Sequence, residues 1–186
     1  IQTALNSFGT DTVAAWTAFS KVDALYWMIG GSFGAAVITF VGQNYGAGKK
    51  ERIREGMRRA LVFVFVFCGM ISILVCLFAR PLMGIFVDEK NQDVIMAGVG
   101  YLRIEAAFYF GIGLLFLLYG YYRAVKKPGM SVVLTLCSLG TRVALAYILS
   151  RIPAIGVTGI WAAIPIGWAL ADAVGVCYYF ERMRRK

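Results

Sequence analysis

The chain has 186 residues, of which 60% are hydrophobic and only 16% are charged, and its formal net charge is +9. Soluble domains are nearer half apolar and a quarter charged, so this composition argues against a water-soluble globular protein and favours one that crosses a membrane several times. The sequence contains no histidine, which excludes the catalytic triads, zinc sites and pH sensors that depend on that residue.

Uncharged apolar runs divide the chain into a series of helices long enough to cross a bilayer, which takes about 20 helical residues. The opening residues, IQTALNSFG, predict the end of a helix that begins upstream. Five full spans are expected after it: 24–48, 60–79, 106–122 with a few residues upstream, 128–150 and 152–180. We therefore predict an all-α membrane protein, a polytopic transmembrane helix bundle that forms one unit over residues 1–186.

Glycines interrupt the first of these full spans. Gly30, Gly31 and Gly34 lie within about one turn of each other. Small residues at this spacing predict a kink or the close approach of a neighbouring helix. They are also candidates for a surface that faces a second group of helices.

Basic residues concentrate in alternate connections, in segments 49–59, 121–127 and 181–186. In the remaining connections, acidic residues slightly outnumber basic ones. The positive-inside rule then predicts a multi-pass protein of the cell (inner) membrane with its C-terminus in the cytoplasm. The lipid bilayer is the expected partner, with contact to anionic lipids as a by-product, and nucleic acid is not expected as a partner.

Three charged side chains fall inside the spans, where a lone charge at the centre of the bilayer costs about 2.5–3.5 kcal/mol. Arg142 and Asp172 lie at similar depths in adjacent antiparallel helices, which predicts an ion pair that either locks the helices or acts in a transport cycle. Glu105 is placed near the outer interface, where it either caps its helix or contacts an ion or substrate.

Aromatic side chains inside the spans either pack against other helices or line a cavity for a lipophilic cation. The candidates for contact with a substrate or ion are Tyr26, Trp27, Glu105, Tyr109, Arg142 and Asp172. No catalytic residue, metal ligand or cofactor is predicted, because the four cysteines lie singly inside apolar runs without CxxC spacing.

Residues 40–48 read FVGQNYGAG and are followed by Lys49, Lys50 and Arg52. This string resembles the GQNxGA…R signature of the MATE (multidrug and toxic compound extrusion) family, with Gln43, Asn44, Gly46 and Ala47 at the motif positions. The earlier NSFG at 6–9 and Ala14-Ala15 are similar to the same family's NxxG…AA stretch. Physically, Gln43 and Asn44 with the nearby glycines are expected to end a helix rather than bind a ligand.

The resemblance implies the C-terminal lobe of a transporter built from two six-helix lobes, with the first helix of this lobe truncated. It also implies a Na⁺- or H⁺-coupled antiporter that exports small amphipathic organic cations by alternating access, with the N-terminal lobe of the same transporter as partner. Some relatives carry a coupling carboxylate in the middle of helix ten, and counting from Arg123 places Ile112 there. A coupling-ion ligand is therefore not expected at that position.

Other functions remain open at this point. A lipid-linked saccharide flippase of the same superfamily would favour a charged cavity over an aromatic one. A fragment could also act as a non-transporting membrane scaffold. A membrane-embedded enzyme is disfavoured, because the spans contain neither histidine nor a paired acidic motif.

Overall fold

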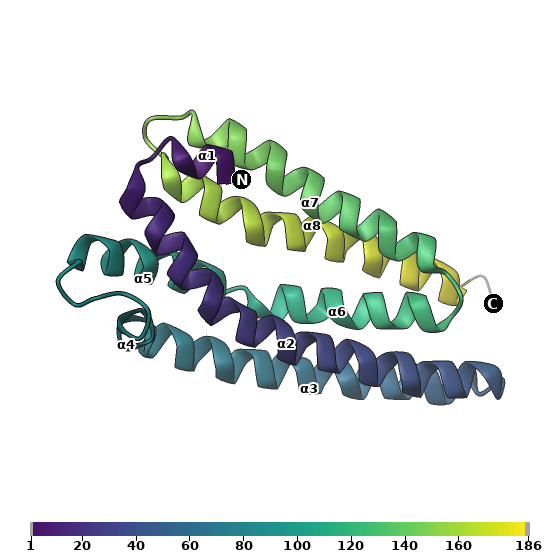
Figure 1. Ribbon diagram of the computed structural model, residues 1–186. Coiled ribbons are helices and arrows are strands. Elements are labelled where there is room, and N and C mark those ends of the chain that lie inside the picture. The colour runs from purple at the N-terminus through teal and green to yellow at the C-terminus, as the bar shows by residue number, and fades with distance from the viewer. Residues whose placement is uncertain (1, 185–186) are drawn as a thin grey trace.

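The computed structural model describes residues 2–184, and each regular element in that range is a helix. The elements in chain order are α1 (Gln2–Asn6), α2 (Thr10–Gly46), α3 (Lys50–Leu77), α4 (Ala79–Gly84), α5 (Gln92–Ala106), α6 (Tyr109–Ala124), α7 (Pro128–Ser150) and α8 (Val157–Arg184). In α2, α3, α7 and α8 the chain is long and apolar enough to cross a membrane, and α5 with α6 makes a fifth such span that is bent by 52°. The predicted all-α membrane bundle is confirmed (Figure 1).

The first full span is longer than the sequence predicted. It was expected to begin after Asp23, but α2 already begins at Thr10. The early charges have partners within the fold, since the Trp27 indole donates a hydrogen bond to Asp23 and the Lys21 ammonium lies 5.6 Å from the centre of the Phe86 ring. A helix therefore continues through residues that look like a loop when charge alone is read.

Close contact between α2 and α6 fixes the middle of the bundle. A methyl group on Gly30 would lie 2.7 Å from the Phe116 ring, and one on Gly120 would lie 2.7 Å from the carbonyl oxygen of Gly34. The predicted close approach of a neighbouring helix is thus confirmed for Gly30 and Gly34. These two residues do not face outward as predicted, because α6 covers them, whereas Gly31 is exposed.

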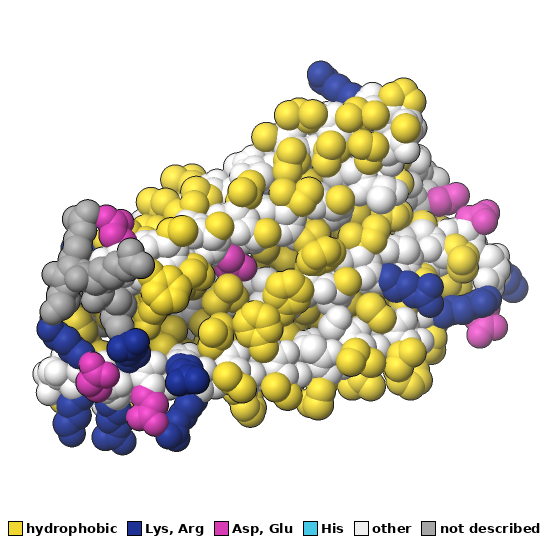
Figure 2. Space-filling view, turned by 180° about the vertical axis from the view of Figure 1, so that it is seen from behind, with side chains coloured by type: hydrophobic (Ala, Val, Ile, Leu, Met, Phe, Trp, Pro, Cys, Tyr) yellow, Lys and Arg dark blue, Asp and Glu magenta, His cyan; other side chains and the backbone are white. Residues whose placement is uncertain are grey.

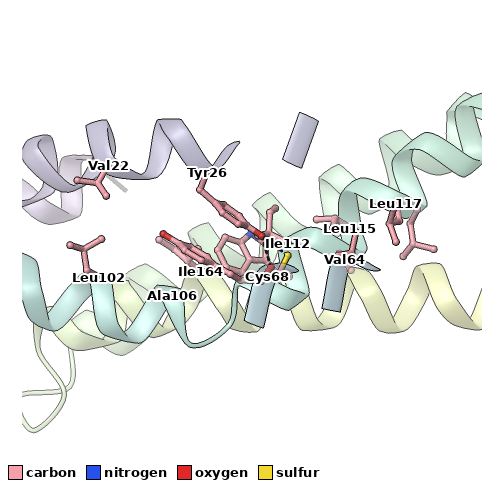
Figure 3. Packing of buried hydrophobic residues seen from close by; sticks show 14 of the residues in the cluster. Val22, Tyr26, Val64, Cys68, Leu102, Ala106, Ile112, Leu115, Leu117 and Ile164 are labelled. Carbon is pink, nitrogen blue, oxygen red and sulfur yellow. Dashed lines mark hydrogen bonds between the residues drawn. The ribbon is translucent and has the colours of Figure 1, made fainter. Parts of the chain in front are cut away.

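The core forms around α6, which lies between the α2–α3 pair and the α7–α8 pair (Figure 1). Apolar side chains from four helices meet there, including Tyr26 of α2, Val64 of α3, Ile112 of α6 and Ile164 of α8 (Figure 3). Most of α6 is buried by its neighbours, although Phe110 stays exposed. The other long helices keep one apolar side exposed, as expected for a protein that lies in a bilayer.

The connections rich in Lys and Arg lie at one end of the bundle. The α2–α3 turn, the α6–α7 turn and the C-terminal end of α8 share that end (Figure 1). Lys and Arg side chains gather there with a few Asp or Glu among them, and both signs of charge also appear at the opposite end (Figure 2). Basic and less basic connections therefore lie at opposite ends of the bundle, as the predicted topology requires.

Candidate functional site

The span formed by α5 and α6 is broken at Ala107 and Phe108, where the chain bends by 52°. The backbone N–H of Phe108 donates to the carbonyl of Glu105 at 2.9 Å, which tightens the end of α5. Irregular backbone at membrane depth is tolerated where protein or a cavity surrounds it, and broken helices of this kind mark the binding sites of many transporters. The break therefore defines the region in which to look for a site.

The carboxylate of Asp23 on α2 faces the start of α6. Its Oδ2 accepts a hydrogen bond from the Trp27 indole at 2.6 Å, and its Oδ1 accepts one from the Tyr109 hydroxyl at 3.4 Å. Asp23 is half-buried. The acid is thus held between its own helix and the first residue after the break.

Tyr26 fixes the same point from the neighbouring turn of α2. Its ring stacks on that of Tyr109 with 3.9 Å between the centres and 7° between the planes. The Tyr26 hydroxyl donates to the Tyr109 carbonyl at 2.7 Å and lies 3.2 Å from the sulfur of Cys68 on α3 (Figure 3). Three helices are therefore joined at the break.

Glu105, one turn before the break, is almost completely buried at 2% exposure. Its Oε2 has no hydrogen-bond partner among the described residues. Its charge interacts with those of Asp23 and Arg142. Glu105 was expected near the outer interface, but the span it belongs to begins at Gln92, so the side chain lies well inside the bundle.

Arg142 of α7 approaches this group of acids from the other side. Its guanidinium carbon lies 5.9 Å from the centre of the Trp168 ring, and its charge interacts with that of Glu105. The Arg142 Nε is buried without a hydrogen-bond partner in the described structure. A cation and two carboxylates thus come together from α7, α5 and α2.

The predicted ion pair between Arg142 and Asp172 is wrong. Among the described residues no ion pair joins Arg142 to Asp172, whereas Glu55 and Arg59 do form one. The helices α7 and α8 touch at Gly167, where an added methyl would lie 3.5 Å from the Cβ of Arg142. Asp172 is five residues further along, which rotates it by about 140° away from α7.

Asp172 instead faces the beginning of α6. Its Oδ2 would lie 3.6 Å from a methyl group on Gly111, and its Oδ1 is buried without a partner in the described part of the chain. Buried polar atoms usually find hydrogen bonds, so unpartnered ones gathered in one region call for a functional explanation. Those in this region are Tyr101 Oη, Glu105 Oε2, Arg142 Nε, Trp168 Nε1 and Asp172 Oδ1.

Of the predicted aromatic candidates, two pack in the interior and one lies at the surface. Tyr26 and Tyr109 are buried, whereas Trp27 is 40% exposed. The gap beside Tyr26 and Cys68 is too small to hold a water molecule. In this arrangement the two tyrosines therefore support the break and do not line an open cavity.

The family motif lies at the end of α2. The Asn44 side chain donates to the Phe40 carbonyl at 2.8 Å, and the backbone N–H of Ala47 donates to the Gln43 carbonyl at 3.1 Å. Gly46 is the last residue of the helix, and Gly48 just beyond it has φ +71°, a conformation that favours glycine. The prediction that this motif ends a helix is confirmed.

The sequence analysis did not identify Asp23, Cys68 or Tyr101 as site candidates. Asp23 and Trp27 are spaced i, i+4, so their side chains lie on one face of a helix. That spacing was a readable signal. The approach of Asp23 to Tyr109 and Glu105 depends on the bend, which no local pattern reveals.

A family comparison and relatives agree with this fold. The family model described as MatE matches residues 2–148. An "FAD transporter" of Shewanella oneidensis is 27% identical and covers 91% of this chain and 36% of its own length. A "Probable multidrug resistance protein YoeA" of Bacillus subtilis is 23% identical, with 94% and 38% covered. The chain thus spans little more than a third of these relatives.

Solved structures show the same arrangement of helices. "Crystal structure of MATE in complex with MaL6" superposes with a TM-score of 0.88 at 16% identity, over 96% of this chain and 39% of that one. A transporter of the MOP superfamily from Pyrococcus furiosus gives a TM-score of 0.87 at 23% identity, over 97% and 40%. At these identities the likeness concerns the fold.

Proposed function

Because this chain belongs to the MatE family, we propose that it is the C-terminal lobe of a cation-coupled efflux transporter, a transport protein rather than an enzyme. In this proposal residues 1–186 pack against an N-terminal lobe of the same transporter. The two lobes alternate around a shared site to export small amphipathic organic cations, including multiple drugs. The coupling ion is Na⁺ or H⁺.

The observation that carries the proposal is the position of Glu105 beside the break in a membrane span. The α5–α6 span runs from Gln92 to Ala124, so its middle lies at the break, within one turn of Glu105. Ile112 was expected at the middle by counting back from Arg123. The longer span has a buried carboxylate near its middle, and this geometry supports a coupling-ion ligand within this chain.

The surrounding charges suggest how coupling works. Glu105 and Asp23 interact with each other and with Arg142. A proton or Na⁺ that binds the two acids weakens their electrostatic attraction to Arg142. Release of that cation restores the attraction. Glu105 precedes the break, and Asp23 of α2 accepts a hydrogen bond from Tyr109 just after it. Binding of a cation to both acids is therefore expected to change the bend between α5 and α6, which is a small movement of the kind that two lobes can amplify.

A second substrate class is favoured by one observation. The relative from Shewanella oneidensis is named for FAD, an anion, and Arg142 places a positive charge inside this bundle. A flavin nucleotide would therefore be the alternative substrate. Organic cations remain the first choice, because Asp23, Glu105 and Asp172 outnumber the one arginine near the break.

Cells that express the full-length protein containing this chain test the proposal. We expect them to accumulate less ethidium than cells with an empty vector, and the difference should disappear with Glu105→Gln but persist with Glu89→Gln, a change in the exposed connection between α4 and α5. Flavin nucleotides in the medium are measured in parallel. Excess flavin with unchanged ethidium would favour the second substrate class, and no change in either would contradict transport of both.

The proposed topology follows the charges. We place the basic end of the bundle, with the C-terminus, in the cytoplasm and the α4–α5 connection outside, in the cell membrane. The three basic connections share one end of the fold (Figure 1), as this topology requires. The multi-pass character itself follows from the family and the apolar helices.

A further inference from the structure

A groove runs along the contact between α2 and α3 at the basic end of the bundle. Its volume is about 530 Å³. The lining residues that matter for its chemistry are Phe33, Ala36, Arg52, Glu55, Arg59 and Phe63. None of them belongs to the polar group at the α5–α6 break.

Charge and apolar surface are separated along this groove. Arg52 lies at the charged end, on the first turn of α3, and Arg59 lies two turns further along the groove as the last charged residue before the uncharged stretch 60–79. At the other end the Phe33 ring lies 5.5 Å from that of Phe63 and 5.3 Å from that of Phe67, measured between centres. From Arg52 to Phe63 the helix rises about 16 Å, so one elongated amphipathic molecule can touch both ends.

The groove depends on a glycine contact. The Phe40 ring packs directly on Gly56, where a methyl group would lie 2.1 Å from a ring atom. This contact brings α2 and α3 together at the charged end, while Ala36 and Ala60 leave space beyond it. The hollow is therefore built by specific small residues and is not a general property of a lipid-exposed helix.

We propose that this groove binds an anionic phospholipid of the leaflet at the basic end, with the phosphate at Arg52 and Arg59 and an acyl chain along Phe33, Ala36 and Phe63. Charge complementarity selects this occupant, because arginine forks match phosphate oxygens and clusters of basic residues beside a span attract anionic lipids. Figure 2 shows Lys and Arg bordering apolar surface at this end of the molecule.

Glu55 lowers the positive charge of the proposed lipid site. Its carboxylate pairs with Arg59 on the next turn of the same helix. The pair reduces the positive charge that Arg59 offers to a phosphate, so Arg52 is expected to carry more of the attraction. Removing the Glu55 charge should release Arg59 and strengthen lipid binding.

Native mass spectrometry of the full-length protein tests this proposal, with phosphatidylglycerol as the probe and phosphatidylcholine as the neutral comparison. Arg52→Gln should weaken phosphatidylglycerol binding by about fivefold, whereas Arg54→Gln, which makes the same charge change on the same turn outside the groove, should leave it close to that of the unchanged protein. Glu55→Gln should strengthen binding, and Glu51→Gln should not.

A substitution that fills the groove without changing its charge distinguishes binding in the groove from general electrostatic attraction of the lipid. Ala36→Trp fills the apolar end and should lower phosphatidylglycerol binding, while Ala35→Trp on the neighbouring exposed position should not. Unfolding temperatures in detergent confirm that each variant is folded. Equal loss in Arg52→Gln and Arg54→Gln, or no loss with Ala36→Trp, would overturn the proposal, as would a change in oligomeric mass with unaltered lipid binding, which would assign the groove to a second copy.

Discussion

The Tyr26 hydroxyl is a single polar group on which the geometry of the break depends. It donates to the backbone carbonyl of Tyr109, the first residue of α6, and lies against Cys68 of α3. A hydroxyl buried between three helices has no water with which to replace these partners. Its removal therefore leaves a carbonyl and a thiol poorly satisfied at the point where the span bends.

Tyr26→Phe is expected to lower the free energy of unfolding by about 1 kcal/mol, the usual worth of one buried hydrogen bond. Unfolding in detergent followed by circular dichroism measures the change. Tyr147→Phe is the matched control, because that side chain is 39% exposed on α7. An equal, small effect of both substitutions would show that the Tyr26 hydroxyl does not hold the break.

Arg142 should couple energetically to Glu105 and not to Asp172. In double-mutant cycles with Arg142→Gln, we expect a coupling energy of about 0.5–3 kcal/mol with Glu105→Gln and additivity within about 0.5 kcal/mol with Asp172→Asn. The physical reason is that the Arg142 charge interacts with Glu105, while Asp172 is rotated toward Gly111. Unfolding of the three single and two double variants supplies the cycles, and the reverse pattern would restore the ion pair predicted from depth alone.

The depth of a residue along a helix can be read from the sequence. The neighbouring helix that its side chain faces cannot, because this depends on how each helix is rotated about its axis in the bundle. Arg142, Glu105 and Asp172 were identified as site candidates because charges inside apolar runs are conspicuous. Their pairing was wrong because it was inferred from depth without the rotation of α8 about its axis. Asp23 was missed for a related reason, since a charge close to Lys21 looks like part of a connection when its hydrogen-bond partners are unknown.

Among the helices, α7 illustrates what a sequence can predict. Its predicted bounds, 128–150, agree with Pro128–Ser150, because Pro128 marks the start and Arg151 with Pro153 marks the end. The α5–α6 span was predicted too short, since Arg103 and Glu105 interrupt the apolar run. Tertiary packing buries Glu105 inside the bundle and carries the span through it, an effect that propensity and hydropathy do not contain.

Packing of α2 against α6 depends on glycine at the contact and not elsewhere. Gly120→Ala is expected to destabilise the protein by about 1–3 kcal/mol, because the methyl would lie 2.7 Å from the Gly34 carbonyl oxygen and the backbone must move. Gly31→Ala on the exposed side of α2 has nothing within 4 Å of the added methyl and should stabilise by about 0.4–1 kcal/mol. Melting temperatures in detergent rank the two, and destabilisation by both would argue against this helix contact.

For the whole molecule, the arrangement of loops predicts which reagents reach which residue. A cysteine introduced by Glu55→Cys should react with an impermeant maleimide only from the cytoplasmic side, and one introduced by Asn91→Cys only from outside, because the two positions lie at opposite ends of the bundle. Labelling of intact cells and of inverted vesicles measures both. Swapped labelling would reverse the proposed orientation while leaving the fold intact.

The polar group at the break unites the observations made on single residues and on helices. Asp23, Glu105 and Arg142 come from three helices, and their charges interact beside the bend between α5 and α6. If the protein couples efflux to a cation, this is the part of the chain in which that cation should bind.

Transport by the full-length protein in sealed proteoliposomes, driven by an imposed proton or sodium gradient, tests the coupling most directly. We predict that one of the two gradients drives ethidium against its concentration difference and that Glu105→Gln lowers the gradient-driven rate by at least about tenfold, while Glu89→Gln keeps it. Gradient-driven transport by Glu105→Gln at the unaltered rate would contradict the assignment of cation coupling to this site.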